Sequence, residues 1–118
     1  MTARAEAVHL KAPLVSRMAI HDVLQRLPGY TNNIEVSLPK VQRLVNQLVR
    51  NPNFVLKPAL IDPRAFGRVI TVDGTHRTIA CALLKIDLPT DFSRLPAKRV
   101  GPTGFVYWRP WKEVRITG

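Results

Sequence analysis

The sequence predicts a small α+β fold, a mixed sheet with about three helices, and an irregular α/β arrangement is the alternative. The chain has 118 residues, which supports a single domain over 1–118. Ten prolines divide it, and because each disfavours helix at the preceding residue, long helices are confined to three windows. Apolar, β-branched runs lie between and after these windows. Helices and strands mixed in one short chain indicate an α+β unit.

Each helical window has an apolar face. The first covers residues 16–27, where Ser16 can cap the helix and the apolar residues are Ile20, Val23, Leu24 and Leu27. The second covers 37–50, where Ser37 can cap and the apolar stripe is formed by Val41, Leu44, Val45 and Leu48. The third runs from about 75 to 85, and its buried side is formed by Ile79, Ala80, Leu83 and Leu84.

Strand signals lie between the second and third helices. Residues 59–61 follow a proline and are predicted to end at the turn pair Asp62-Pro63. Residues 68–72 are β-branched and apolar, and a loop with Gly67 can join the two runs as a hairpin. Asp73-Gly74 is also a hairpin signal, but the residues after it have helical spacing. We therefore predict strand, tight turn and helix.

The C-terminal third has weaker signals. A short strand is expected within 88–92, and two more are expected at 104–108 and 113–116. The last two are predicted to be separated by Arg109-Pro110-Trp111, and 98–102 is predicted to be a mobile loop.

The charge balance points to a polyanionic partner. Eighteen Lys and Arg residues stand against eight Asp and Glu, a formal net charge of +10, which fits nucleic acid, a nucleotide or an anionic membrane. The single cysteine, Cys81, excludes a disulfide framework and a Cys-rich zinc site. No run approaches the ~18–20 apolar residues of a membrane span, and Glu6 interrupts any signal-peptide core. We expect a soluble, cytoplasmic protein without a membrane partner.

The strongest local pattern is the run 69–77, in which a glycine separates a strand from a helix. The first N–H groups of a helix have no internal partner and carry the positive end of its dipole, so such a turn favours an anion. The expected phosphate-binding residues are Gly74, Thr75, His76, Arg77 and Thr78. Asp73 can hold Arg77 or His76, cap the helix or bind a metal ion. The alternative is an ordinary helix start with Arg77 as a solvated surface residue.

The run 72–80, Val-Asp-Gly-Thr-His-Arg-Thr-Ile-Ala, resembles the motif of the ParB/sulfiredoxin-like superfamily: a glycine, two variable residues and an arginine that opens a helix. The order of elements agrees, with a preceding helix, a short strand after Pro58, a hairpin into the turn, a helix near a Leu-Leu pair, and a proline-containing strand. The resemblance is clearest over 37–92. It leaves 93–118 as a basic, aromatic C-terminal extension.

The resemblance implies a nucleotide or nucleic-acid phosphate at the turn from Gly74 to Arg77, with ATP or CTP and Mg²⁺ as the candidate cofactors. The superfamily includes nucleotide-hydrolysing DNA-partition proteins, nucleases, an ATP-using sulfinic acid reductase and a free-serine kinase, so the fold constrains the ligand better than the reaction. Thr75 stands where the reductase has its catalytic cysteine, which argues against sulfiredoxin activity. His76-Arg77 replaces the arginine pair of the partition proteins, and 118 residues leave no room for their second domain.

Three functions are therefore kept. The first is binding of nucleic acid or a nucleotide phosphate at the Gly-Thr-His-Arg turn. The second is a metal-assisted nuclease or a nucleotide hydrolase or kinase with Asp73, His76 and Arg77 as catalytic residues, although few carboxylates are present to hold Mg²⁺. The third is a small protein-interaction or inhibitor module, for example of a mobile element, that keeps the fold without catalysis.

Two further groups are candidate nucleic-acid contacts. The helical stripe of Lys40, Arg43, Gln47 and Arg50 is either a solvated face or, if it lies beside Gly74, a track for a longer polymer. In the C-terminal segment, Trp108, Arg109 and Trp111 can stack on unpaired bases, bind a partner protein or pack in the core. His9 and His21 have no companion ligands, so no metal site is expected.

Overall fold

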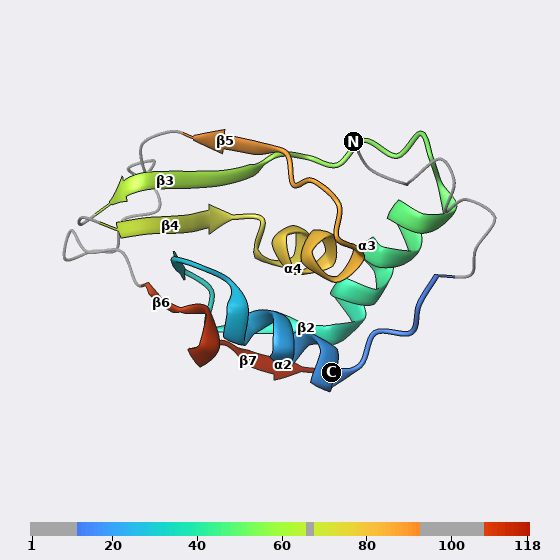
Figure 1. The fold of residues 1–118 in the computed structure, drawn as a ribbon, viewed down its shortest axis with the longest axis horizontal. Helices are drawn as coiled ribbons and strands as arrows, with labels where there is room; N and C mark the ends of the chain where they lie inside the picture. The colour runs from blue at the N-terminus through green and yellow to red at the C-terminus, as the bar shows by residue number, and fades with distance from the viewer. Residues whose placement is uncertain (1–11, 66–67, 93–107) are drawn as a thin grey trace.

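The fold is α+β, as the sequence predicts. In the computed structural model, residues 12–65, 68–92 and 108–118 are described, and they form three α-helices, a mixed five-stranded sheet and a second sheet of two strands (Figure 1). None of the helices in these ranges is long and apolar enough to cross a membrane.

The three helices match the predicted windows closely; they are α2 (Arg17–Arg26), α3 (Leu38–Arg50) and α4 (Thr75–Leu84). The predicted serine caps are confirmed for the first two. The Ser16 hydroxyl accepts the N–H of Ala19 at 3.0 Å, and the Ser37 hydroxyl accepts the N–H of Lys40 at 3.3 Å. Each serine therefore satisfies an N–H that the first helical turn leaves without a partner.

The larger sheet has the strand order β5-β3-β4-β1-β6. Its strands are β1 (Tyr30–Thr31), β3 (Ala59–Ala65), β4 (Arg68–Asp73), β5 (Thr90–Phe92) and β6 (Arg109–Pro110). The predicted hairpin is confirmed, because β3 and β4 are antiparallel neighbours in the chain. The β5–β3 and β1–β4 pairs are parallel, and the β1–β6 pair is antiparallel. A separate parallel pair joins β2 (Glu35–Ser37) to β7 (Arg115–Thr117).

The predicted end of the first strand at Asp62-Pro63 is wrong, because β3 continues to Ala65. Its pairing with β4 shifts register between Asp62 and Ala65, at the position of the proline. The pairing of β3 with β5 covers only residues 59–61. A proline in a strand is tolerated at an irregularity or along an unpaired edge, because it has no N–H to donate.

The C-terminal segment also differs from the prediction. Arg109-Pro110, expected to separate two strands, is itself β6, and Trp111–Glu113 forms a 3₁₀ turn, η2, before β7. Most of the strand predicted at 104–108, and the loop predicted at 98–102, lie outside the described residues. β1 and β2 were not predicted, because runs of two and three residues are too short for a periodicity to appear.

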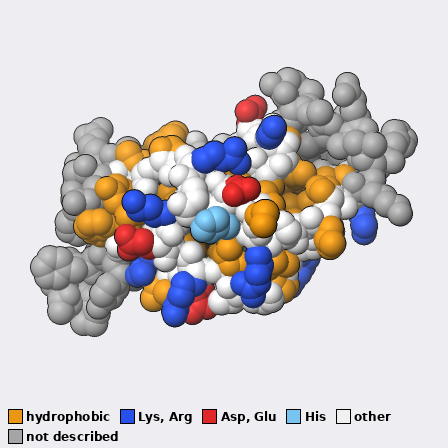
Figure 2. Space-filling model, turned by 60° about the horizontal axis from the view of Figure 1, so that its bottom comes forward, with side chains coloured by type: hydrophobic (Ala, Val, Ile, Leu, Met, Phe, Trp, Pro, Cys, Tyr) orange, Lys and Arg blue, Asp and Glu red, His pale blue; other side chains and the backbone are white. Residues whose placement is uncertain are grey.

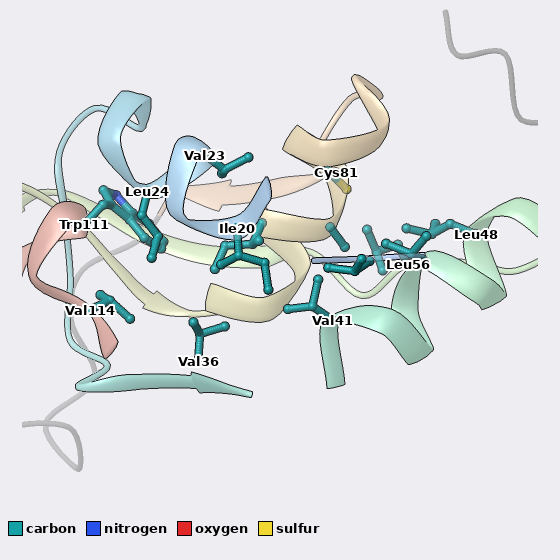
Figure 3. Close-up of a cluster of buried hydrophobic side chains, with 14 of the residues drawn as sticks. Ile20, Val23, Leu24, Val36, Val41, Leu48, Leu56, Cys81, Trp111 and Val114 are labelled. Atoms are coloured by element: carbon teal, nitrogen blue, oxygen red, sulfur yellow. The ribbon is translucent and has the colours of Figure 1, made fainter. Parts of the chain in front are cut away.

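The main core lies where α4 packs against both α2 and α3, with β2 and η2 closing the cluster. Trp111 is only 2% exposed and lies in this cluster beside Leu24, and the buried thiol of Cys81 belongs to it too (Figure 3). A smaller cluster on the sheet is centred on Ile70 and Val72. α4 is thus fixed on several sides, which gives its N-terminus a defined position.

Candidate functional site

The turn between β4 and α4 is built on Gly74, which has a left-handed backbone with φ of 103°. A Cβ at this position would lie 2.7 Å from the Cβ of Ala59 on β3 and 2.9 Å from its Cα. Glycine is therefore required twice, by the backbone angle and by the close approach of β3.

The N-terminus of α4 has no side-chain cap. The N–H groups of Thr75, His76 and Arg77 belong to the first turn, where a helix supplies no carbonyl partner. Thr78 is the first residue whose N–H is used, and it donates to the Gly74 carbonyl at 2.9 Å. The first turn of α4 therefore presents donors at the positive end of its dipole.

The two threonine hydroxyls of this turn are used inside the protein. The Thr75 hydroxyl lies 2.9 Å from that of Thr31 on β1, and both side chains are buried. The Thr78 hydroxyl donates to the Gly74 carbonyl at 2.9 Å. Thr78, predicted as a phosphate ligand, thus spends both its hydroxyl and its N–H on Gly74, and Thr75 keeps only its N–H for a ligand.

Arg77 joins the turn to the start of β3. Its Nη1 donates to the carbonyls of Lys57 and Pro58 at 2.8 and 2.9 Å, and its Nη2 lies 3.4 Å from Asp73 Oδ2. The side chain is 13% exposed, so these contacts are partly shielded from water. Of the roles predicted for Asp73, the structure shows the one in which the carboxylate holds Arg77.

His76 joins the same turn to α3. Its Nε2 accepts the backbone N–H of Ser37 at 2.9 Å, which requires that nitrogen to be unprotonated. Burial of the imidazole and the positive charge of Lys40 both lower the pKa of His76 from its ordinary value of 6.5. His76 is therefore neutral at pH 7 and supplies no cationic charge to the site.

A cavity of about 380 Å³ opens at this turn. It is lined by residues 72–77, by Leu44 of α3, by Asn33 and by the segment 54–57 before β3. The lining combines polar groups of the turn with apolar side chains that include Leu44, Phe54 and Leu56. Cavities of this size hold small molecules, and this mixed lining suits a ligand with one charged and one apolar part.

The cationic stripe of α3 begins beside the cavity. Ser37 contacts His76, Lys40 is close enough to affect the pKa of His76, and Leu44 lines the cavity. Lys40, Arg43 and Arg50 are all exposed. On the face drawn in Figure 2, Lys and Arg side chains surround a histidine and hydrophobic side chains, with fewer acidic groups between them. Only the Lys40 end of the stripe is placed near the turn, and Arg43 and Arg50 do not line the cavity.

The three C-terminal candidates are not at this cavity. Trp111 is a core residue, so its predicted role in stacking on bases is wrong. Trp108 is half-buried, and its ring meets Tyr30 edge-to-face with centroids 5.2 Å apart. Arg109 is half-buried in β6. Packing thus explains Trp111 fully and accounts for much of the surface of Trp108.

The described residues contain no group of three or more His, Cys, Asp or Glu side chains that could hold a metal ion. The sequence did not identify Asn33, Leu44 or the segment 54–57 as lining residues of the cavity. This segment shows neither helical nor strand periodicity. The only sequence signal near it is the group of turn-forming residues that precedes it.

In comparisons with known proteins, no family model matches the chain, and no curated protein or solved structure matches it.

Proposed function

We propose that this protein binds a phosphate-bearing ligand, nucleic acid or a nucleotide, in the cavity at the N-terminus of α4. The observation that carries the proposal is that the uncapped first turn of α4 borders a 380 Å³ cavity whose lining also includes apolar side chains. The N–H groups of Thr75, His76 and Arg77 are the phosphate donors, and the apolar side chains receive the base or sugar.

Several observations support this binding mode. Lys57 lines the cavity and Lys40 lies beside it, so both attract an anion. Arg77 positions the wall by holding the carbonyls of residues 57 and 58. The net charge of +10 favours the same class of ligand. The proposed fold family, ParB/sulfiredoxin-like, rests on the turn motif and the order of elements and agrees with this ligand.

The proposal is tested by NMR titration of the full chain with ATP, CTP and a short oligonucleotide. We expect the amide signals of Thr75, His76 and Arg77 to shift most, since a bound phosphate accepts their protons. Lys40→Ala and Lys57→Ala should weaken binding, whereas Lys112→Ala, an exposed cation on η2, should not. Binding that leaves these three amides unmoved would contradict the proposal.

The alternative, a nuclease or a nucleotide hydrolase or kinase, would use the same site. It is kept as a proposal because Asp73 lines the cavity and its side chain is 37% exposed. Incubation with ATP, CTP and plasmid in the presence of Mg²⁺ tests it, with Asp73→Ala as the control. Turnover that the variant loses supports catalysis, and the absence of turnover with every substrate rules out the tested reactions.

A further inference from the structure

A second cavity, of about 670 Å³, lies beside the one at the α4 turn and differs from it in character. Eight of the ten described residues that line it are apolar, among them Leu48 and Ile86. The two polar residues, Asn53 and Asp87, are exposed, and Asp87 carries the only charge among these ten. Cavities of this size with a mainly apolar lining are typical of small-molecule sites. The lining therefore fits an uncharged, apolar group and disfavours a second phosphate.

The two cavities adjoin along two parts of the chain. On α3, Leu44 lines the first cavity and Leu48 lines the second, and residues four apart lie on the same face of a helix. The segment 54–56 lines both cavities. Figure 3 shows Leu56 of this segment beside Leu48, and both side chains are buried. A ligand held in the first cavity can therefore reach the second by extending along the segment 54–56.

This shared wall is held at both ends, although it is neither helix nor strand. The N–H of Phe54 donates to the Asn51 carbonyl at 3.1 Å. Arg77 holds the two carbonyls that precede β3, and the N–H of Ala59 donates to the Pro89 carbonyl at 2.8 Å. Pro89 also lines the second cavity, so this bond joins two parts of its lining. A lining that is already in place lowers the entropy lost when a ligand binds.

Val55 lies in the middle of the shared wall and is 87% exposed. Its neighbours differ, because Phe54 is half-buried and Leu56 is buried. Removal of apolar surface from water is the main favourable contribution when an apolar group binds. Val55 offers such surface, which the fold itself leaves in water and which a ligand lying along the segment 54–56 would cover.

From these observations we infer that the ligand is a soluble phosphate ester with an extended apolar arm. The phosphate binds at the first turn of α4, and the arm lies along residues 54–56 and enters the second cavity. This inference rests on the proposed function and adds the chemical class of the rest of the ligand. Free phosphate esters and membrane phospholipids share this chemistry, and the test separates the two sources.

The test measures the affinity of the full chain for ethyl, butyl, hexyl and octyl phosphate by NMR titration, at concentrations at which none of them forms micelles. We expect the affinity to rise with chain length, by up to about fourfold for each methylene that becomes buried. All four compounds should shift the amide signals of Thr75, His76 and Arg77, and the longer ones should also shift those of Ile86 and Asp87. Octanol, which lacks the phosphate, should bind at least ~10-fold more weakly than octyl phosphate.

Ile86→Ala probes the second cavity alone, because Ile86 lines it and does not line the first. We expect this variant to weaken octyl phosphate binding by ~5-fold or more and to leave ethyl phosphate binding unchanged. Val55→Ala repeats the test at a side chain whose exposure keeps it out of the core, with an expected loss of ~3-fold for octyl phosphate. Met18→Ala is the matched control, because Met18 is an apolar side chain of α2 that is 74% exposed and lines neither cavity.

The failure of this inference differs from the failure of the proposed function. Equal affinity for ethyl and octyl phosphate, with shifts confined to the α4 turn, overturns the apolar arm and leaves the phosphate site intact. Equal affinity for octanol and octyl phosphate, without shifts at the α4 turn, overturns the phosphate site and with it the inference. Binding to phosphatidylcholine vesicles that contain phosphatidic acid, without binding of octyl phosphate, overturns the assignment to a soluble ester.

Discussion

The N-termini of α3 and α4 lie side by side and are built in opposite ways. At α3, the Ser37 hydroxyl accepts an N–H of the first turn, so the helix supplies its own cap. At α4, the cap position is Gly74, which has no side chain, and the hydroxyl of Thr75 is turned toward Thr31. His76 links the two ends through the N–H of Ser37.

The two helix ends therefore differ in role: the capped end of α3 stabilises the fold, and the uncapped end of α4 is the one that we propose binds a ligand. A capped N-terminus has satisfied part of its donor capacity, whereas the first turn of α4 presents its donors to the cavity. The side chains around α4 are nevertheless engaged, because Arg77, Thr78 and His76 all contact backbone groups of the protein. The turn is thus held by side-chain contacts to backbone groups, and no side chain caps its first N–H groups.

The largest effect is expected at Gly74. In Gly74→Ala the alanine has to adopt a left-handed backbone, and its Cβ lies against Ala59. We therefore expect the free energy of unfolding, measured by urea denaturation, to fall by about 3 kcal/mol. At the other end of α4, Lys85→Gly replaces a left-handed residue with φ of 56°, and this control should leave stability unchanged or raise it. A Gly74→Ala protein as stable as wild type would contradict the close packing of the turn.

A somewhat smaller effect is expected at Arg77. Arg77→Ala removes two hydrogen bonds to carbonyls from a side chain that is 13% exposed, and we expect a loss of about 2 kcal/mol. Arg77→Lys should recover part of it. The surface pair of Arg115 and Glu35 provides the comparison, since Arg115→Ala should cost below about 0.5 kcal/mol. Equal losses in the two alanine variants, by thermal or urea unfolding, would mean that Arg77 is an ordinary surface cation.

The cap of α3 comes next. Ser37→Ala removes the hydroxyl but keeps the N–H that donates to His76, so the expected cost is about 1 kcal/mol from the cap alone. Ser37→Asn should restore most of the stability, because asparagine also caps well. If NMR spectra of the alanine variant also showed displaced amide signals in the α4 turn, the cap of α3 and the structure of the α4 turn would not be independent of each other.

The smallest effect is a pH dependence. The pKa of His76 is lowered in the folded protein by burial and by Lys40, so below pH 6.5 the unfolded chain binds more protons than the folded one. The free energy of unfolding should therefore decrease as the pH falls from 6.5 toward the lowered pKa. His76→Gln should flatten this slope, and His21→Gln, at an exposed histidine of α2, should keep it. A slope unchanged in His76→Gln would assign it to other groups.

Much of this local structure follows from the sequence, because it depends on neighbours in the chain. The helix caps Ser16 and Ser37, the β3–β4 hairpin and the glycine turn are all local patterns, and each was predictable. Local signals were also misleading where tertiary pairing decided: Asp62-Pro63 continues a strand, and Arg109-Pro110 forms one against β1.

For the candidate site, the sequence determined the strand–glycine–helix turn on which it is built and the positive net charge of the chain. Only the tertiary structure decided what each side chain does there. Arg77 donates to the carbonyls of Lys57 and Pro58, His76 accepts a hydrogen bond from the backbone N–H of Ser37, and Trp111 is buried in the core. The hydrogen bonds of Arg77 and His76 join residues 19 to 39 positions apart in the chain, and Trp111 packs in the core beside Leu24, so no local pattern encodes these contacts. The reason is physical: a backbone turn is fixed by its own few residues, but a side chain's partner is fixed by whatever the fold packs against it.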